Sequence, residues 1–322
     1  MAQFNWEKLG KVFDPSNRFE WMDSYAQVPT PLILKDKIRV YYTCRPKPDH
    51  DGKFVSHTSY IDLDINDPSK VLYIHNKPIV DMGEVGSFDE FGIHPTSVLK
   101  HDNKVLLYYT GWSRKESVPY QTWIGLLVSS DNGETFQRVS NGPIIGSGLA
   151  NPYLANGAFV LKKEKGFVMF YASAKSWYQG SGKPEPIYSI KCAESFDGVN
   201  WETSNNSILP EAQDNECISR PSVVYLEGEY HMWYAYRSAK EDFRSDSNFS
   251  YKIGYANSTD LKNWIRCDRD AGIVCSNYGW DSEMMSYPYV VKLAEDLLMF
   301  YNGNGFGKEG FGLARVNNYT NG

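Results

Sequence analysis

The stretch Asp281-Ser-Glu283-Met-Met-Ser286-Tyr287-Pro288-Tyr-Val-Val291 decides the fold, because the sequence contains it twice. The earlier copy lies 67 residues upstream and reads Asp214-Asn-Glu216-Cys-Ile-Ser219-Arg220-Pro221-Ser-Val-Val224. Both copies follow the pattern D-x-E-x-x-S-x-P-x-V-V, in which carboxylates precede a short apolar run. Each run leads into an aromatic segment, Met232-Trp-Tyr234 or Met299-Phe-Tyr301. A signal repeated at such a long period indicates stacked supersecondary units.

Alignment on this repeat divides the chain into five units. Each unit opens with a Pro or Gly before a short apolar strand, continues through a tight polar turn, and reaches a second strand that ends in paired aromatics. The openers are separated by 66, 62, 64 and 67 residues and are Pro29, Pro95, Gly157, Pro221 and Pro288. Each unit is long enough for four short strands bounded by turn residues.

A third strand is visible in the later units, and a polar turn follows it. The turn Ser129-Ser-Asp131-Asn-Gly133-Glu-Thr-Phe136 resembles the Asp-box turn of sialidase-type propellers. In such a turn the Asp side chain accepts backbone hydrogen bonds while the aromatic ring packs beneath it. We therefore expect a structural role for this turn and for its counterparts at Asp197 and Asp260.

The fifth unit is too short to hold a fourth strand of its own. The N-terminal stretch Trp6-Glu-Lys-Leu-Gly-Lys-Val-Phe13 is similar to the fourth strands that begin at Trp201 and Trp264. We therefore expect an all-β fold, a five-bladed β-propeller with four-stranded blades, closed by the N-terminal strand completing blade five. Such closure leaves only short, protected sheet edges. We expect residues 1–322 to form one domain.

The composition excludes several classes of function. The net charge is −6 and the basic residues are scattered, so no nucleic-acid partner is expected. The five cysteines lack the spacing of a zinc site or a disulfide framework. We expect no cofactor, no metal and no calcium loop. The sequence shows no secretion signal and no membrane span, which indicates a cytoplasmic location. Aromatic residues make up 15% of the chain and suit stacking on sugar rings.

The long loops between second and third strands should lie on one face and carry the function. Carboxylates reach the same face, because Glu90, Glu216 and Glu283 each lie five residues before an opener and Asp23 lies six before Pro29. Strand ends add further candidates for binding, namely Arg45, His94, Trp112, Lys175, Arg220, Arg237 and Tyr287. Acids, guanidinium groups and aromatic rings around one axis are what a carbohydrate site uses.

Five blades with acids at the innermost strands resemble the propeller glycosidases of glycoside hydrolase family 43 and its relatives in families 32, 62 and 130. The resemblance covers essentially the whole chain at the level of repeats. It implies that Asp23 is the general base and that Glu216 is the general acid. At the blade-three position, where family 43 has an Asp that tunes the acid, this sequence has Asn151, before Pro152. Since an amide cannot raise the pKa of a neighbouring acid by charge repulsion, either Glu283 or Glu90 supplies that charge from a neighbouring blade, or the chemistry differs.

The sequence therefore predicts a glycosidase-like enzyme that acts on a sugar or glycoconjugate, with Asp23, Glu216 and Glu283 as catalytic residues. A carboxyl separation of about 6.5–9.5 Å would predict inversion of configuration. Two alternatives remain open. One is a phosphorylase or transferase, in which Arg45, His94, Arg220 and Arg237 hold phosphate or an acidic sugar. The other is a carbohydrate-binding propeller without catalysis, which Asn151 favours. The sequence leaves the oligomeric state open.

Overall fold

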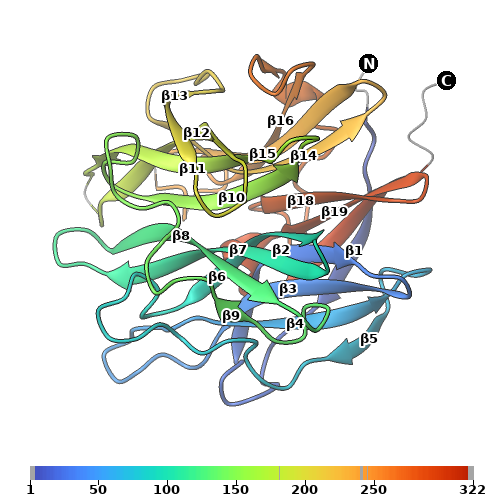
Figure 1. Cartoon of the computed structure of the whole chain (residues 1–322), viewed down its shortest axis with the longest axis horizontal. Coiled ribbons are helices and arrows are strands. Elements are labelled where there is room, and N and C mark those ends of the chain that lie inside the picture. The colour runs from blue at the N-terminus through green and yellow to red at the C-terminus, as the bar shows by residue number, and fades with distance from the viewer. Residues whose placement is uncertain (1–3, 181, 240–241, 245, 318–322) are drawn as a thin grey trace.

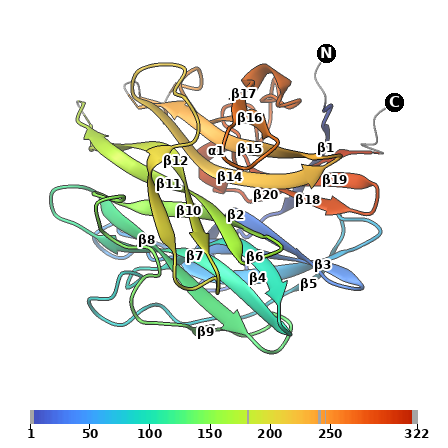
Figure 2. The ribbon, with the colours of Figure 1, turned by 45° about the horizontal axis from the view of Figure 1, so that its top comes forward.

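The computed structural model describes residues 4–180, 182–239, 242–244 and 246–317. Five four-stranded antiparallel sheets follow one another around a central axis, as the sequence predicts (Figures 1 and 2). In blades one to four, strand order from the axis outward follows chain order. The innermost strands β2, β6, β10, β14 and β18 contact their neighbours around the ring.

The strand bounds are as follows. Blade one contains β2 (Ser24–Ile33), β3 (Lys37–Arg45), β4 (His57–Asp64) and β5 (Val71–Ile74). Blade two contains β6 (Ile93–His101), β7 (Lys104–Arg114), β8 (Tyr120–Ser129) and β9 (Gln137–Arg138). Blade three contains β10 (Ala155–Lys162), β11 (Phe167–Tyr178), β12 (Glu185–Ser195) and β13 (Glu202–Ser207). Blade four contains β14 (Glu216–Leu226), β15 (Glu229–Ser238), β16 (Lys252–Ser258) and β17 (Ile265–Arg266). Blade five contains β18 (Ser286–Leu293), β19 (Asp296–Asn302), β20 (Phe311–Val316) and β1 (Glu7–Phe13).

Two short helical turns complete the elements, η1 (Asp268–Asp270) and α1 (Asn304–Gly307). Neither is long or apolar enough to cross a membrane.

The N-terminal strand closes the ring. β1 pairs antiparallel with β20, from Glu7 opposite Arg315 to Phe13 opposite Phe311, so the blue strand lies beside red ones in Figure 1. The preceding residues reach across to blade four, where Phe4 and Trp6 pack against Trp233 with ring centroids 4.8 and 5.4 Å apart. The predicted closure is therefore confirmed.

The polar turns after the third strands have the expected structural role. Asp131 accepts hydrogen bonds from the backbone N–H groups of Glu134 and Thr135, and Phe136 is buried below. Burial acts to raise the pKa of Asp131, but these bonds, together with those from the hydroxyls of Ser129 and Thr135, lower it to about 2. Asp197 and Asp260 hold their turns in the same way.

Candidate functional site

A β-bulge interrupts the innermost strand of every blade. The strand register shifts between Gln27 and Thr30 in blade one, and shifts recur at the same place in the other four blades. Four of the five positions at these bulges have a positive φ, between 53° and 62°. Bulges re-aim side chains, and non-glycine residues in this conformation cost about 1–2 kcal/mol each. The positions at or beside these shifts, here called the bulge positions, are Val28, His94, Gly157, Arg220 and Tyr287. In blade two the shift lies between Pro95 and Ser97, and His94 is the neighbouring residue, paired with Thr110.

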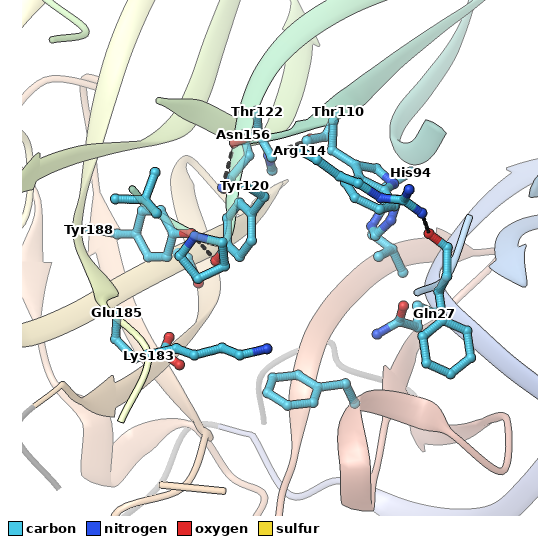
Figure 3. Close-up of a pocket in the computed structure, with 18 of the residues that line it drawn as sticks. Gln27, His94, Thr110, Arg114, Tyr120, Thr122, Asn156, Lys183, Glu185 and Tyr188 are labelled. Carbon is cyan, nitrogen blue, oxygen red and sulfur yellow. Dashed lines mark hydrogen bonds between the residues drawn. The ribbon is translucent and has the colours of Figure 1, made fainter. Parts of the chain in front are cut away.

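These five bulge residues line a cavity of about 770 Å³ at one end of the propeller. Loops between second and third strands build its wall, as the sequence predicts, and contribute Phe54, Glu116, Lys183, Phe243 and Phe306. Figure 3 shows Tyr120, Tyr188, Lys183 and Glu185 on one side of the open space and Gln27, His94 and Arg114 on the other. The volume lies within the range of small-molecule sites.

The cavity lining is rich in aromatic and basic side chains. Nine lining residues are aromatic, and the rings of Phe243, Tyr251 and Phe306 lie edge to face with centroids 5.8–6.1 Å apart. Tyr120 and Tyr188 join hydroxyl to hydroxyl over 3.2 Å, and burial raises the pKa of Tyr120 to about 12. Such tyrosines keep their protons and act as hydrogen-bond donors or acceptors to a ligand.

Six of the seven binding residues predicted from strand ends line this cavity. They are Arg45, His94, Trp112, Arg220, Arg237 and Tyr287. Lys175 does not belong to the lining, because the register of β11 shifts between Ala174 and Ser176 and the Lys175 side chain pairs with Glu211 instead.

The predicted carboxylates lie outside the lining. Glu216 is 1% exposed, and its two oxygens bind the guanidinium of Arg266 at 2.6 and 2.8 Å. Glu283 is exposed on the loop before β18, and Glu90 accepts a hydrogen bond from the backbone of Gly86. The backbone of Asp23 pairs with that of Arg45, but its side chain is not part of the cavity wall. None of these four acids therefore lies in the wall of this cavity.

Asn151 is buried away from the cavity. Its backbone pairs with Gly148, and its side-chain oxygen has no hydrogen-bond partner in the described part of the chain. Glu283 is exposed on the loop before β18. The expectation that Glu283 or Glu90 supplies the charge missing at Asn151 stays a prediction.

Carboxylates before the innermost strands instead fasten the outermost strands of their own blades. Asp89 binds Arg138 of β9 at 2.8 Å, and Asp281 binds Lys8 of β1 at 2.7 Å. Glu216 binds Arg266 of β17 in the same arrangement. These three ion pairs are here called the blade clamps; blade five uses the first acid of the repeated pattern, Asp281, and blade four uses the second, Glu216.

Sequence reasoning missed Glu185, Arg114 and Arg244, which line the cavity from strand ends and loops. Glu185 is one of two described carboxylates in the wall, with the exposed Glu116. It accepts hydrogen bonds from Arg237 at 3.4 Å and from Arg244 at 3.0 Å. Glu185 and Arg244 lie in or beside the long loops expected to face the site. Their position in these loops is the one feature of the sequence that indicates a place in the cavity wall. Among the described residues, no group of three or more His, Cys, Asp and Glu side chains is arranged to hold a metal.

Comparisons with known proteins agree with this architecture. No family model matches the sequence. Two uncharacterized proteins of Mycobacterium tuberculosis, MT1551 of strain CDC 1551 / Oshkosh and Rv1502 of strain ATCC 25618 / H37Rv, are each 34% identical to it over 315 residues. The matches cover 97% of this chain and 99% of each relative.

Solved structures share the fold at low identity. A structure described as a glycoside hydrolase has a TM-score of 0.74 at 17% identity, over 97% of this chain and 92% of that one. A thermostable family-43 glycoside hydrolase has a TM-score of 0.64 at 15% identity, over 93% and 90%. A structure from the GH130 family of mannoside phosphorylases, described as containing glycoside hydrolases that target β-1,2 mannosidic linkages in Candida mannan, has a TM-score of 0.69 at 14% identity, over 98% and 94%. The chain belongs to the family of the two mycobacterial proteins, and its fold is a five-bladed β-propeller like that of these solved structures.

Proposed function

We propose that this protein is a glycosidase-like enzyme whose sugar substrate binds in the cavity at the end of the propeller axis. The observation that carries the proposal is the cavity itself, with its ring of bulge residues and its nine aromatic side chains. Strained backbone that presents side chains to a common space is a feature of functional sites. Aromatic faces stack on the apolar faces of sugars. Proteins with this fold are described as glycoside hydrolases, which supports the choice of reaction class.

We propose Glu185 as the carboxylate that exchanges a proton with the substrate. A general acid or base must reach the reacting atom to within a hydrogen bond, so it has to belong to the cavity wall. The Glu185 side chain is 18% exposed, and Arg237 and Arg244 fix its orientation. In this proposal Glu216 stabilises blade four through Arg266. The sequence-based roles of Asp23 and Glu216 stay predictions that the same experiment tests.

The experiment compares Glu185→Gln with Glu216→Gln on a panel of chromogenic aryl glycosides. We expect Glu185→Gln to lower kcat by about 100-fold or more while KM changes little, as loss of a general acid or base does. Glu216→Gln should keep kcat and lower the melting temperature. Glu194→Gln, an exposed glutamate on β12, is the matched control. Loss of turnover in Glu216→Gln with full activity in Glu185→Gln would restore the sequence-based assignment.

A second candidate is carbohydrate binding without catalysis. One observation favours it: none of the five bulge positions, Val28, His94, Gly157, Arg220 and Tyr287, brings a carboxylate to the centre of the cavity. A glycan array followed by mass spectrometry of the bound glycans separates the two candidates. Intact glycans after prolonged incubation with the protein would select the binding function over the enzymatic one.

A further inference from the structure

The charge of the cavity is opposite to that of the chain. The protein carries a net charge of −6, yet the described cavity wall contains eight Lys and Arg side chains against two Glu. Clefts lined by one sign of charge raise the local concentration of ligands of the other sign. The charge of the cavity wall therefore favours an anionic ligand. The partners of four arginines in the wall indicate where such a ligand would bind.

Two of these arginines already have a partner. Arg237 and Arg244 both pair with Glu185, and their guanidinium groups stack on the ring of Phe243 at 3.8 and 4.6 Å. One carboxylate shared between them offsets part of their charge.

Arg220 has no carboxylate partner among the described residues. Its side chain is almost fully buried, and its two terminal nitrogens donate to the carbonyl of Thr96 and the hydroxyl of Thr30 at the axis. Its Nε has no hydrogen-bond partner, and no described carboxylate lies within 4.0 Å of the group. Burial lowers the pKa of Arg220 to about 10. A buried charge without a counter-ion costs several kcal/mol, which a bound anion would offset.

Arg45 also has no carboxylate partner among the described residues, and its charge, like that of Arg220, acts on His94. Its guanidinium lies over the rings of Tyr25 at 4.4 Å and Phe54 at 5.3 Å, and its Nε has no hydrogen-bond partner. Burial lowers the pKa of Arg45 as well, and the nearby charge of Arg244 adds to the effect. No ion pair involves Arg45 in the described part of the chain.

Two neutral groups complete the set: the indole N–H of Trp112 and the ring of His94, whose Nε2 donates in the tautomer that carries its proton there. His94 Nε2 and Trp112 Nε1 are buried nitrogens of the same cavity wall without hydrogen-bond partners in the described ranges. Burial, with the charges of Arg45 and Arg220, lowers the pKa of His94 to about 3, so its ring is neutral near neutral pH. Unmet buried donors of this kind cost about 1–3 kcal/mol each unless a ligand accepts their hydrogen bonds.

We infer that the substrate of the proposed enzyme is a sugar with a covalently attached phosphate ester, which Arg45 and Arg220 bind with the help of His94 and Trp112. A phosphate monoester carries about −1.5 to −2 charge at pH 7 and offers three acceptor oxygens. It therefore matches two unpaired arginines and two neutral donors, whereas a carboxylate carries one charge on two oxygens. An arginine fork suits phosphate geometry, and the Arg45 guanidinium makes no hydrogen bond within the described ranges, whereas Arg220 offers its Nε. The inference rests on the proposed function and names its substrate class.

Isothermal titration calorimetry with the full chain tests the inference. The probes are the 1-phosphates of glucose, galactose, mannose and N-acetylglucosamine, the same four sugars without phosphate, glucuronate and galacturonate, and inorganic phosphate alone. We expect at least one sugar phosphate to bind more tightly than its parent sugar, the matching uronate and inorganic phosphate, by about 10- to 100-fold, the range of charge-assisted hydrogen bonds. Added salt should weaken this binding.

Arg45→Gln should remove the advantage of the phosphate and leave the parent sugar unaffected. The Arg45 guanidinium makes no hydrogen bond within the described ranges, so we expect the variant to fold normally. Its circular dichroism spectrum should match that of the wild type. Arg220→Lys is the second variant and tests the fork with the charge retained. Arg18→Gln is the control, since Arg18 also stacks on a ring, that of Phe13, but lies outside the cavity wall.

Each other outcome overturns the inference. Inorganic phosphate that binds as tightly as every sugar phosphate indicates a co-substrate or an adventitious ion. Uronates that bind best indicate a carboxylate ligand, and equal affinity for neutral sugars, or no binding by any probe, removes the anionic substrate altogether. The proposed function fails separately: if sugar phosphates bind but no aryl glycoside, with or without a 6-phosphate on its sugar, releases its aryl alcohol in the turnover assay, the ligand class stands and the enzyme is excluded.

Discussion

At the scale of single residues, position within the bulge decides what reaches the cavity. Arg220 and Tyr287 precede prolines and have φ values of 53° and 55°, so the backbone turns their side chains into the centre. Glu216, four residues before Arg220, is paired with Arg266 instead. Residues so close in sequence thus have different surroundings, one in the cavity wall and the other in an ion pair.

His94 gives a prediction at this scale. Its pKa is about 3 in the folded chain and 6.5 when unperturbed, so the unfolded state binds the extra proton as the pH falls below 6.5. Folding stability from this residue is therefore complete above pH 6.5 and declines toward pH 3. We expect His94→Gln to reduce the loss of stability between pH 6.5 and about pH 5 by about 1–2 kcal/mol. Urea unfolding at several pH values measures this.

His50 provides the control for that experiment, because its side chain is 91% exposed. His50→Gln should leave the pH dependence of unfolding as it is in the wild type. An unchanged pH profile in His94→Gln would show that the His94 ring is protonated and hydrated in the folded protein, contrary to its buried position.

At the scale of elements, the blade clamps explain how two-residue outer strands persist. β17 consists of Ile265 and Arg266, and it has only two residue pairs with β16. Arg266 adds a two-point contact with Glu216 and a contact of 2.6 Å with Asp268. The outer strand is therefore held from the side of the innermost strand as well as by its own sheet.

Removing one partner of a clamp should be costly. Arg266→Met leaves the buried Glu216 without a counter-charge, and we expect a loss of about 3–5 kcal/mol in the free energy of unfolding. The double variant Glu216→Gln with Arg266→Met should recover part of that loss. Lys163→Met, which breaks an exposed pair with Glu194, should change stability by less than about 1 kcal/mol. Chemical denaturation of the three variants measures their free energies of unfolding and shows whether the clamp contributes more to stability than a surface ion pair.

The sequence predicts the elements better than it predicts the directions of side chains. Proline or glycine openers and paired aromatics locate the units because backbone restriction and burial act locally. The strand end predicts Lys175 at the site, but one register shift in β11 turns it toward Glu211. Glu216 has the position of a catalytic acid in the repeat, yet its partner Arg266 lies 50 residues away in sequence, at the far end of the same unit. Glu185 and Arg244 lie where the chain has no periodicity, so no pattern distinguishes a wall residue from its neighbours.

At the scale of the whole molecule, ring closure depends on the first strand. We propose that residues 1–322 form a single cooperative unit, because β1 completes blade five while Phe4 and Trp6 pack on blade four. Arg220 also joins blade four to blades one and two through Thr30 and Thr96. Contacts of this kind couple blades that are not neighbours in sequence.

Deletion of residues 1–15 should therefore unfold or aggregate the protein, since it exposes the edge of β20 and the ring of Trp233. The same residues joined after the C-terminus by a short flexible linker should restore folding, because β1 and β20 are antiparallel neighbours. Size-exclusion chromatography reports the oligomeric state of the truncated and the rejoined chain. Unfolding followed by fluorescence and by circular dichroism reports their stability. A monomeric, active truncated chain would contradict the closure, and non-coincident transitions in the full chain would contradict the single unit.

The bulge ring has a consequence for protein engineering. Each blade brings one position of its innermost strand to the cavity wall, and four of these positions carry a side chain, since Gly157 has none. Val28, His94 and Tyr287 are the positions to vary in a combinatorial library, because Arg220 also bonds to Thr30 and Thr96 of other blades. Selection from such a library could redirect this scaffold to new ligands while its outer strands and blade clamps stay as they are.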